Sequence, residues 1–173
     1  MSKPLTKQHA GKTSAVAVVR EKSAPWTVKK ASGVVSYCVH GPGGKIVAAD
    51  FTTPKLIEVL RSGLPVQELN DLQTTLEVPM EKLVPMLGIS KATLHRRKAE
   101  GKLDPAESDR VVRFARLMGR ALEVLESEES ARQWLTSPQF GLGGAVPLEY
   151  AETEVGAREV EDLLGRIEYG VYS

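Results

Sequence analysis

The 173-residue chain contains one cysteine and three histidines, and this scarcity excludes several kinds of site. A single cysteine, Cys38, cannot form a disulfide within the chain and cannot build an all-cysteine metal centre. Cys38 and His40 together offer two ligands, whereas a structural zinc ion needs about four. We therefore expect no metal site.

Long hydrophobic runs are also missing, although 42% of the residues are hydrophobic. No stretch approaches the roughly 18 consecutive apolar residues that a membrane-spanning helix needs. The first residues do not combine a basic region with an apolar core, as a secretory signal would. These absences predict a cytoplasmic protein with no membrane partner.

Catalytic motifs are equally scarce, so we expect no enzyme activity and no cofactor. Residues 141–144 read GLGG, but no Lys-Ser or Lys-Thr follows them and no strand precedes them. This stretch therefore predicts a bend rather than a phosphate-binding loop. The histidines are far apart in the sequence, and a catalytic triad could only be assembled by arbitrary choice among many residues.

The net charge of +1 conceals an uneven distribution of charge along the chain. Residues 1–50 carry 8 basic and 2 acidic side chains, whereas residues 121–173 carry 3 basic and 11 acidic ones. The intervening residues 51–120 carry 12 basic and 9 acidic side chains. A chain that is basic at one end and acidic at the other predicts two partners of different charge, although solvated surfaces produce the same pattern.

Residues 1–52 form the first predicted region, a basic N-terminal arm. Residues 1–31 mix Lys, Ser, Thr and Ala without a sustained period, which is typical of a flexible segment. The runs GVVSYCVH and KIVAAD are rich in residues that favour strands, and Gly-Pro-Gly-Gly separates them. These two runs therefore predict a short β-hairpin.

From residue 53 onward the chain shows the periodicity of helices, so the predicted fold class is mainly α, a helical bundle. Thr53 and Pro54 open a first helix that stops at Gly63, and Pro65 opens a second. Short helices joined by tight turns bury their apolar residues on one another. These residues are Leu56, Ile57 and Leu60 in the first helix, and Val66, Leu69, Leu72 and Leu76 in the second.

Residues 80–101, MEKLVPMLGISKATLHRRKAEG, predict a helix-turn-helix. The first helix ends at Gly88, which can adopt a left-handed turn, and Ser90 can cap a second helix that ends at Gly101. Two residues are unusual for the motif. Pro85 falls inside the first helix, and Arg97 stands where the motif more often packs an apolar side chain.

The second helix of this motif carries the candidate DNA-binding residues. Its outward positions combine hydrogen-bonding groups for base edges with cations for phosphates. They are Ser90, Lys91, Thr93, His95, Arg96 and Lys98. A solvated basic helix on an ordinary bundle would carry the same residue types, so the pattern has two interpretations.

A third helix is predicted from Asp104, as the cap, to about Glu126, with Pro105 in the first turn and Glu107 able to reach back. Arginines recur along it at spacings of three and four, so they cluster on one side. They are Arg110, Arg113, Arg116 and Arg120. These arginines could contact phosphate or pair with the acidic C-terminal region, and the sequence favours neither.

The last predicted helix begins after Thr153 and runs almost to the end of the chain. Its inward positions are apolar, and its outer face is acidic, with Glu159, Glu161, Asp162 and Glu168. Tyr169, Val171 and Tyr172 then follow, with no later segment to cover them. These residues either complete the core of the chain itself or contact a partner.

The C-terminal third resembles the toxin-binding domain of the Xre/MbcA/ParS-type antitoxins. The family pattern of Trp-Leu, Pro, Leu-Gly-Gly, Pro-Leu, Thr, Gly, Val, Leu-Leu, Arg-Ile and Gly is present here in order. The matching residues are Trp134, Leu135, Pro138, Leu142, Gly143, Gly144, Pro147, Leu148, Thr153, Gly156, Val160, Leu163, Leu164, Arg166, Ile167 and Gly170. The stretch TLHRRKAEGKLDPAESDRVVRFARL resembles the helix-turn-helix half of the same family, so the resemblance covers roughly residues 54–173.

The resemblance implies a type II antitoxin whose partner is a RES-domain toxin that consumes NAD or uses it for ADP-ribosylation. It implies a helix-turn-helix domain over residues 53–126, which binds operator double-stranded DNA, and a helical toxin-binding domain over residues 127–173. Because helix-turn-helix modules usually read two-fold sites, we expect a homodimer.

The implied toxin-binding residues lie at the end of the last helix and in the tail. A toxin pocket that holds the phosphates of a dinucleotide is expected to be cationic, so an acidic helix that ends in tyrosines suits it as a plug. The residues are Glu161, Leu164, Arg166, Ile167, Glu168, Tyr169, Val171, Tyr172 and Ser173. The alternative is a stand-alone transcription regulator whose C-terminal bundle serves dimerisation or ligand sensing.

Overall fold

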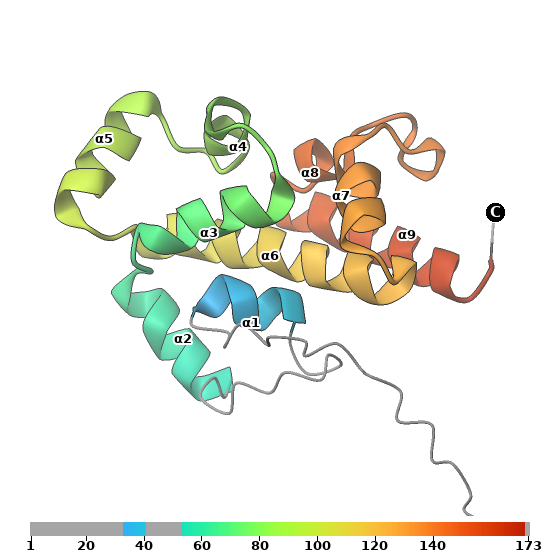
Figure 1. Ribbon diagram of the computed structural model, residues 1–173, viewed down its shortest axis with the longest axis horizontal. Coiled ribbons are helices and arrows are strands. Elements are labelled where there is room, and N and C mark those ends of the chain that lie inside the picture. Colours follow the sequence, from blue (N-terminus) through green and yellow to red (C-terminus); the bar gives the residue numbers. More distant parts are fainter. Residues whose placement is uncertain (1–32, 41–52, 172–173) are drawn as a thin grey trace, which may run out of the picture.

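The computed structural model describes residues 33–40 and 53–171, which form a helical structure (Figure 1). No β-sheet occurs in these two ranges, where strand-like pairing is limited to isolated bridges between Pro65 and Lys102 and between Gln139 and Ala145. The prediction of a mainly α fold is confirmed. The helices are α1 (Val34–His40), α2 (Thr53–Ser62), α3 (Gln67–Leu76), α4 (Met80–Met86), α5 (Lys91–Glu100), α6 (Pro105–Leu125), α7 (Glu128–Thr136), the 3₁₀ turn η1 (Phe140–Leu142), α8 (Pro147–Tyr150) and α9 (Glu154–Glu168).

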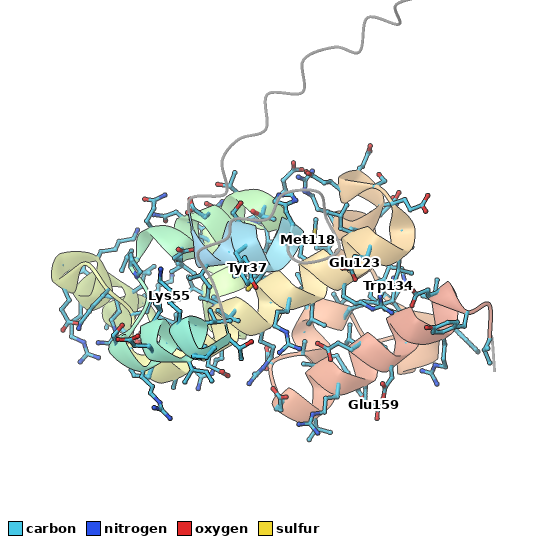
Figure 2. The ribbon with its side chains drawn as sticks, turned by 90° about the horizontal axis from the view of Figure 1, so that it is seen from below. Tyr37, Lys55, Met118, Glu123, Trp134 and Glu159 are labelled. Carbon is cyan, nitrogen blue, oxygen red and sulfur yellow. The ribbon has the colours of Figure 1, made fainter. Side chains whose placement is uncertain are left out.

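Helix α6 runs through the centre of the molecule (Figure 1). Helices α1, α2, α3, α7 and α9 all pack against it. Because helices surround it, α6 buries apolar residues on several sides, and Phe114, Leu117 and Met118 are fully buried. Figure 2 shows Met118 among these helices, whereas Glu159 lies on the outer side of α9. Buried residues of both halves of the chain, from Val34 to Leu164, therefore belong to one hydrophobic core.

Helix α6 begins with the predicted capping box. The carboxylate of Asp104 accepts a hydrogen bond from the amide of Glu107, and the carboxylate of Glu107 accepts one from the amide of Asp104, each at 2.8 Å. Pro105 occupies the first turn. These two bonds satisfy amide donors that would otherwise lack a partner at the start of a helix.

Helices α4 and α5 form the predicted helix-turn-helix. Gly88 has a φ of +65°, which lies in the left-handed region that favours glycine. The hydroxyl of Ser90 caps α5 by accepting a hydrogen bond from the amide of Thr93 at 3.1 Å. Pro85 lies inside α4, where it removes a backbone donor, and the helix ends one residue later at Met86. The proline therefore shortens the first helix without removing the motif.

The prediction of a β-strand at GVVSYCVH is wrong, because residues 34–40 form helix α1. The amides of Val34 and Val35 each donate to the buried carboxylate of Glu68, from α3, at 2.9 Å. Glu68 thus caps α1 from a distant part of the sequence, and the valines of α1 are buried in the shared core. These contacts override the local preference for a strand. The second predicted strand and residues 1–31 lie outside the described residues.

Helices α7, α8 and α9 and the turn η1 complete the C-terminal part of the chain. The GLGG stretch forms the predicted bend, in which the amide of Gln139 donates to the carbonyl of Ala145 at 3.0 Å. Thr153 caps α9 as predicted, since its hydroxyl accepts a hydrogen bond from the amide of Gly156 at 3.1 Å. Within the described ranges, no helix is both long and apolar enough to span a bilayer.

Candidate functional site

The outer face of α5 is open to solvent. Lys91, His95, Arg96 and Lys98 are exposed, and the helix buries none of its residues completely. The nearest acidic group to the Arg96 guanidinium is Glu100, at 3.8 Å, and 60% of the Arg96 side chain is accessible. The cations that the sequence assigned to DNA binding therefore stand together on one accessible helix.

Ser90 and Thr93 hold the start of this helix. Besides the cap, their hydroxyl oxygens lie 2.9 Å apart in a hydrogen bond. Ser90 is exposed and Thr93 is half-buried, so both remain at the surface beside the exposed cations. The cap determines where the N-terminal end of α5 points, which is the end that enters the major groove in helix-turn-helix proteins.

Arg97 anchors the inner face of α5. Its guanidinium donates to Glu107 at 2.7 Å, to Asp104 at 2.7 Å and to Glu100 at 2.9 Å. The hydrogen bond to Glu107, followed by that to Glu100, raises the pKa of Arg97 above its ordinary value. The position expected to carry an apolar side chain thus carries an arginine that joins α5 to the capping box of α6. The exposed face of α5 is consequently held in a fixed orientation.

The arginines of α6 mostly pair with α9. Arg110 instead donates to the carbonyl of Leu87 at 2.9 Å, within the helix-turn-helix. Ion pairs at the surface each contribute little stability, about 1 kcal/mol or less. Their effect here is to align α9 with α6. Of the two interpretations, contact with phosphate or pairing with the acidic C-terminal region, the structure shows the pairing for three of the four arginines. The pairs are Arg113 with Glu154 at 3.1 Å, Arg116 with Glu161 at 3.6 Å, and Arg120 with Glu168.

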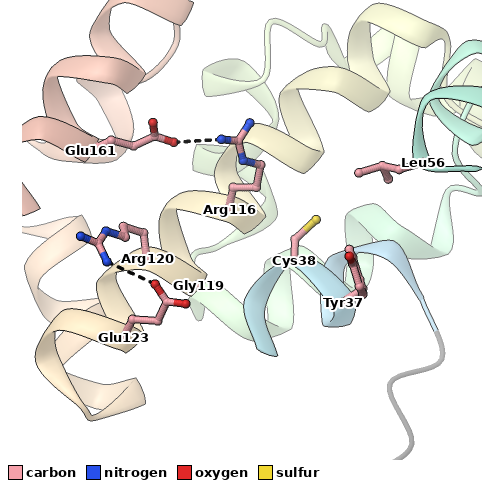
Figure 3. A pocket seen from close by; sticks show the side chains of 8 residues that line it. All are labelled: Tyr37, Cys38, Leu56, Arg116, Gly119, Arg120, Glu123 and Glu161. Carbon is pink, nitrogen blue, oxygen red and sulfur yellow. Dashed lines mark hydrogen bonds and ion pairs between the residues drawn. The ribbon is translucent and has the colours of Figure 1, made fainter. Parts of the chain in front are cut away.

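A cleft of about 400 Å³ lies between α1, α2, α6 and α9 (Figure 3). Its lining includes the Cys38 thiol and the pairs that Arg116 and Arg120 make with Glu161 and Glu123. Burial raises the pKa of Cys38 to about 11. The thiol is therefore protonated at neutral pH and lacks the thiolate that nucleophilic catalysis requires.

The structure separates the predicted toxin-binding residues into inner and outer groups. Leu164 has no exposed surface and lies in the core, so it is not available to a partner. It follows Val160 by one helical turn, on the face of α9 that packs inward. Ile167 is half-buried, whereas Glu161 and Glu168 lie at the surface in the ion pairs with α6.

The end of α9 presents apolar groups to solvent. The accessible fractions are 78% for Tyr169 and 54% for Val171, so neither packs into the core. Gly170 adopts a φ of +66°, and the amide of Val171 donates to the carbonyl of Arg166 at 2.9 Å. This turn sets the direction of the tail at the end of α9. Tyr172 and Ser173 lie outside the described residues.

Sequence reasoning missed Gly165, which lies on α9 between Glu161 and Glu168, the two residues that pair with arginines of α6. A Cβ atom at this position would have no neighbour within 4 Å. Gly165 borders a surface groove whose lining also includes Arg166, Tyr169 and Val171. The available signal was a glycine in the interior of a helix, where it costs about 1 kcal/mol relative to alanine.

Comparison with known families separates the chain into two matched regions. The model of the antitoxin Xre-like helix-turn-helix domain matches residues 55–116. The model of the antitoxin Xre/MbcA/ParS C-terminal toxin-binding domain matches residues 120–170. The first region includes α5 with its exposed cations, and the second includes α9 and the exposed Tyr169. Helix α1 precedes both regions.

Three known relatives each match about two thirds of the chain. An Antitoxin Xre of Yersinia enterocolitica is 34% identical over 120 residues, which are 68% of this chain and 81% of the relative. The chain belongs to the Xre family of antitoxins. An Antitoxin Xre of Photorhabdus laumondii is also 34% identical, over 69% of this chain and 82% of its own length. A Sphingobium protein named Prs ADP-ribosylating antitoxin is 25% identical, over 68% of this chain and 80% of its own length.

Proposed function

We propose that this antitoxin neutralises a RES-domain toxin, which consumes NAD or transfers ADP-ribose, by occluding the toxin's active site with α9 and the tail. The observation that carries the proposal is the exposure of Tyr169 and Val171 at the end of the helix that closes the toxin-binding domain. Aromatic groups left uncovered on a rigid support are typical anchors of protein interfaces.

The charge of α9 supports the same proposal. Glu159 and Asp162 are exposed on its outer side. A pocket that binds the phosphates of a dinucleotide is expected to be cationic, so an acidic helix would be attracted to it and would compete with the substrate. The name of the Sphingobium relative refers to ADP-ribosylation, which is consistent with an NAD-using partner.

We expect deletion of Gly170–Ser173 to weaken binding to the RES-domain protein about 100-fold while the antitoxin stays folded, because aromatic anchors dominate interface energies. The measurements are affinity by calorimetry, NAD consumption by the toxin, and the melting temperature of the antitoxin. Val155→Ala is a matched control, because Val155 is also an exposed apolar residue of α9 but lies at its other end. Full neutralisation by the folded truncated protein would rule out the plug.

We further propose that α5 binds operator DNA as part of a homodimer and represses the chain's own operon. The six candidate residues lie on this helix or at its cap, and four of them have exposed side chains, namely Lys91, His95, Arg96 and Lys98. The other two are Ser90 and Thr93. Two copies of α5 related by a two-fold axis would read two half-sites. A stable 1:1 complex on the natural operator would contradict the dimer.

We expect Arg96→Ala to weaken operator binding by about 1 to 3 kcal/mol and to relax sequence specificity. Lys98→Ala is expected to lower affinity more uniformly across sequences and to reduce the dependence on salt, because a lysine neutralises phosphate. Gel-shift titrations at several salt concentrations measure both effects. Arg158→Ala removes an exposed arginine of α9 and serves as the control. Unchanged binding by both α5 variants would contradict this role.

A further inference from the structure

Arg166 differs from the other half-buried arginines of the described residues. Each of the others donates a side-chain hydrogen bond to an oxygen acceptor, whereas Arg166 makes no such bond and no ion pair. Its Nε atom is buried without a hydrogen-bond partner. A buried donor without an acceptor is costly. The partnered arginines are Arg97, Arg110, Arg113, Arg120 and Arg132.

Arg166 makes no ion pair although an acidic residue lies within one helical turn of it. Asp162 precedes it by one helical turn, which is the spacing at which an acid and an arginine often pair. Asp162 is exposed, yet no pair between the two residues forms. Both residues instead line the groove beside α9, to which Arg120 of α6 also contributes. The guanidinium therefore has no acceptor within the described residues, although Arg166 lines a surface groove.

No packing contact within the described residues requires a glycine at position 165. The glycines inside helices are Gly119, Gly156 and Gly165, and the first two are required by close backbone contacts. A Cβ at Gly119 would lie 2.4 Å from the carbonyl oxygen of Cys38, and one at Gly156 would lie 1.8 Å from that of Tyr150. Gly165 has open space beside it. A helix-weakening residue that no internal contact requires points to an external one.

We infer that Gly165 and Arg166 form a seat for the toxin, in which an apolar toxin side chain lies over Gly165 and a toxin carboxylate binds Arg166. Tyr169 and Val171 supply apolar walls beside Gly165, so the seat is continuous with the exposed tail. A carboxylate is the acceptor that matches a guanidinium best, because it accepts two parallel hydrogen bonds. This inference rests on the proposed function.

Three variants test the seat against a RES-domain toxin, used in a catalytically inactive form. Gly165→Leu fills the seat, and we expect it to weaken toxin binding about 30-fold or more with an equal or higher melting temperature. Gly165→Ala adds one methyl group and is expected to weaken binding about fivefold. Arg166→Met keeps an unbranched apolar stem but removes the donors of the side chain, and we expect a loss of about tenfold or more with no loss of stability. Arg158→Met, on the same helix and paired with Glu154, is the control that should bind normally.

The outcomes separate this inference from the proposed function. If the wild-type antitoxin does not bind the RES-domain protein, the proposed function fails and the seat fails with it. If wild type binds and folded Gly165→Leu and Gly165→Ala bind equally well, the seat is wrong while the proposed function stands. An Arg166→Met variant that melts at a lower temperature but binds with unchanged affinity would show that Arg166 serves the fold, and that result also overturns the seat.

Discussion

An alanine at Gly156 is expected to destabilise the chain by about 3 kcal/mol or more, although alanine is the better helix former. The added Cβ would lie 1.8 Å from the carbonyl oxygen of Tyr150 and 2.8 Å from its carbonyl carbon. These are backbone atoms, so no side-chain rotation relieves the overlap. The first turn of α9 would have to move away from α8, which would disturb the buried Ala157 and Val160.

Urea unfolding measures this loss, and Gly165→Ala is its matched control. The same substitution at Gly165 meets no atom within 4 Å, so it is expected to stabilise the chain by about 0.5 to 1 kcal/mol through helix propensity alone. The two variants should therefore shift the unfolding midpoint in opposite directions. Equal stability of the two variants would contradict a close contact between α8 and α9.

Gly119→Ala is expected to displace α1 from α6. A Cβ at this position would lie 2.4 Å from the carbonyl oxygen of Cys38 and 3.1 Å from that of Val39. Displacement would expose Val34, Val35 and Val39, each worth about 1.5 kcal/mol or more when buried. The expected loss of stability is therefore about 4.5 kcal/mol or more if α1 detaches completely.

Cys38 reports this displacement directly, because it is the only cysteine and lies on α1. Burial raises the pKa of its thiol to about 11, so few thiolates exist at pH 8 in the native protein. Release of α1 would return the pKa to its ordinary range and increase the rate of thiol labelling about 100-fold. Gly165→Ala should label as slowly as wild type. Slow labelling of a stable Gly119→Ala protein would show that α1 does not depend on this contact.

Local signals predicted most of the helices because their ends are encoded by neighbouring residues. Ser90, Asp104 and Thr153 each cap the helix that follows, and each does so through a residue three positions later. Such contacts depend on spacing alone, so they can be read from the sequence. The same is true of Gly88 and Gly101, whose positive φ angles end α4 and α5.

Helix α1 could not be predicted because its cap comes from Glu68, which is 34 positions away from Val34. Its own residues favour a strand, and only the surface of α6 and the carboxylate of Glu68 make a helix the better solution. The partners of the arginines of α6 also could not be predicted from neighbouring residues. Their spacing placed them on one side of the helix, but their pairing with α9 depends on how distant elements pack.

At the candidate toxin-binding surface, the sequence left two interpretations of the tail open, because it could not show whether Tyr169 and Val171 pack into the core. The structure leaves both side chains exposed. Leu164 is among the predicted toxin-binding residues, yet its side chain is buried in the core. Gly165, by contrast, has no side chain that could indicate a role in the sequence. Only the structure shows the open space beside it.

The single core built around α6 has a consequence for turnover in the cell. Because α6 contributes buried residues to both halves of the chain, the surface on α5 and the surface on α9 depend on one folding equilibrium. A protease that captures the unfolded chain therefore destroys both surfaces in the same event. As the antitoxin is depleted, any repression that it exerts and any restraint that it places on a toxin would therefore be lost through the same event.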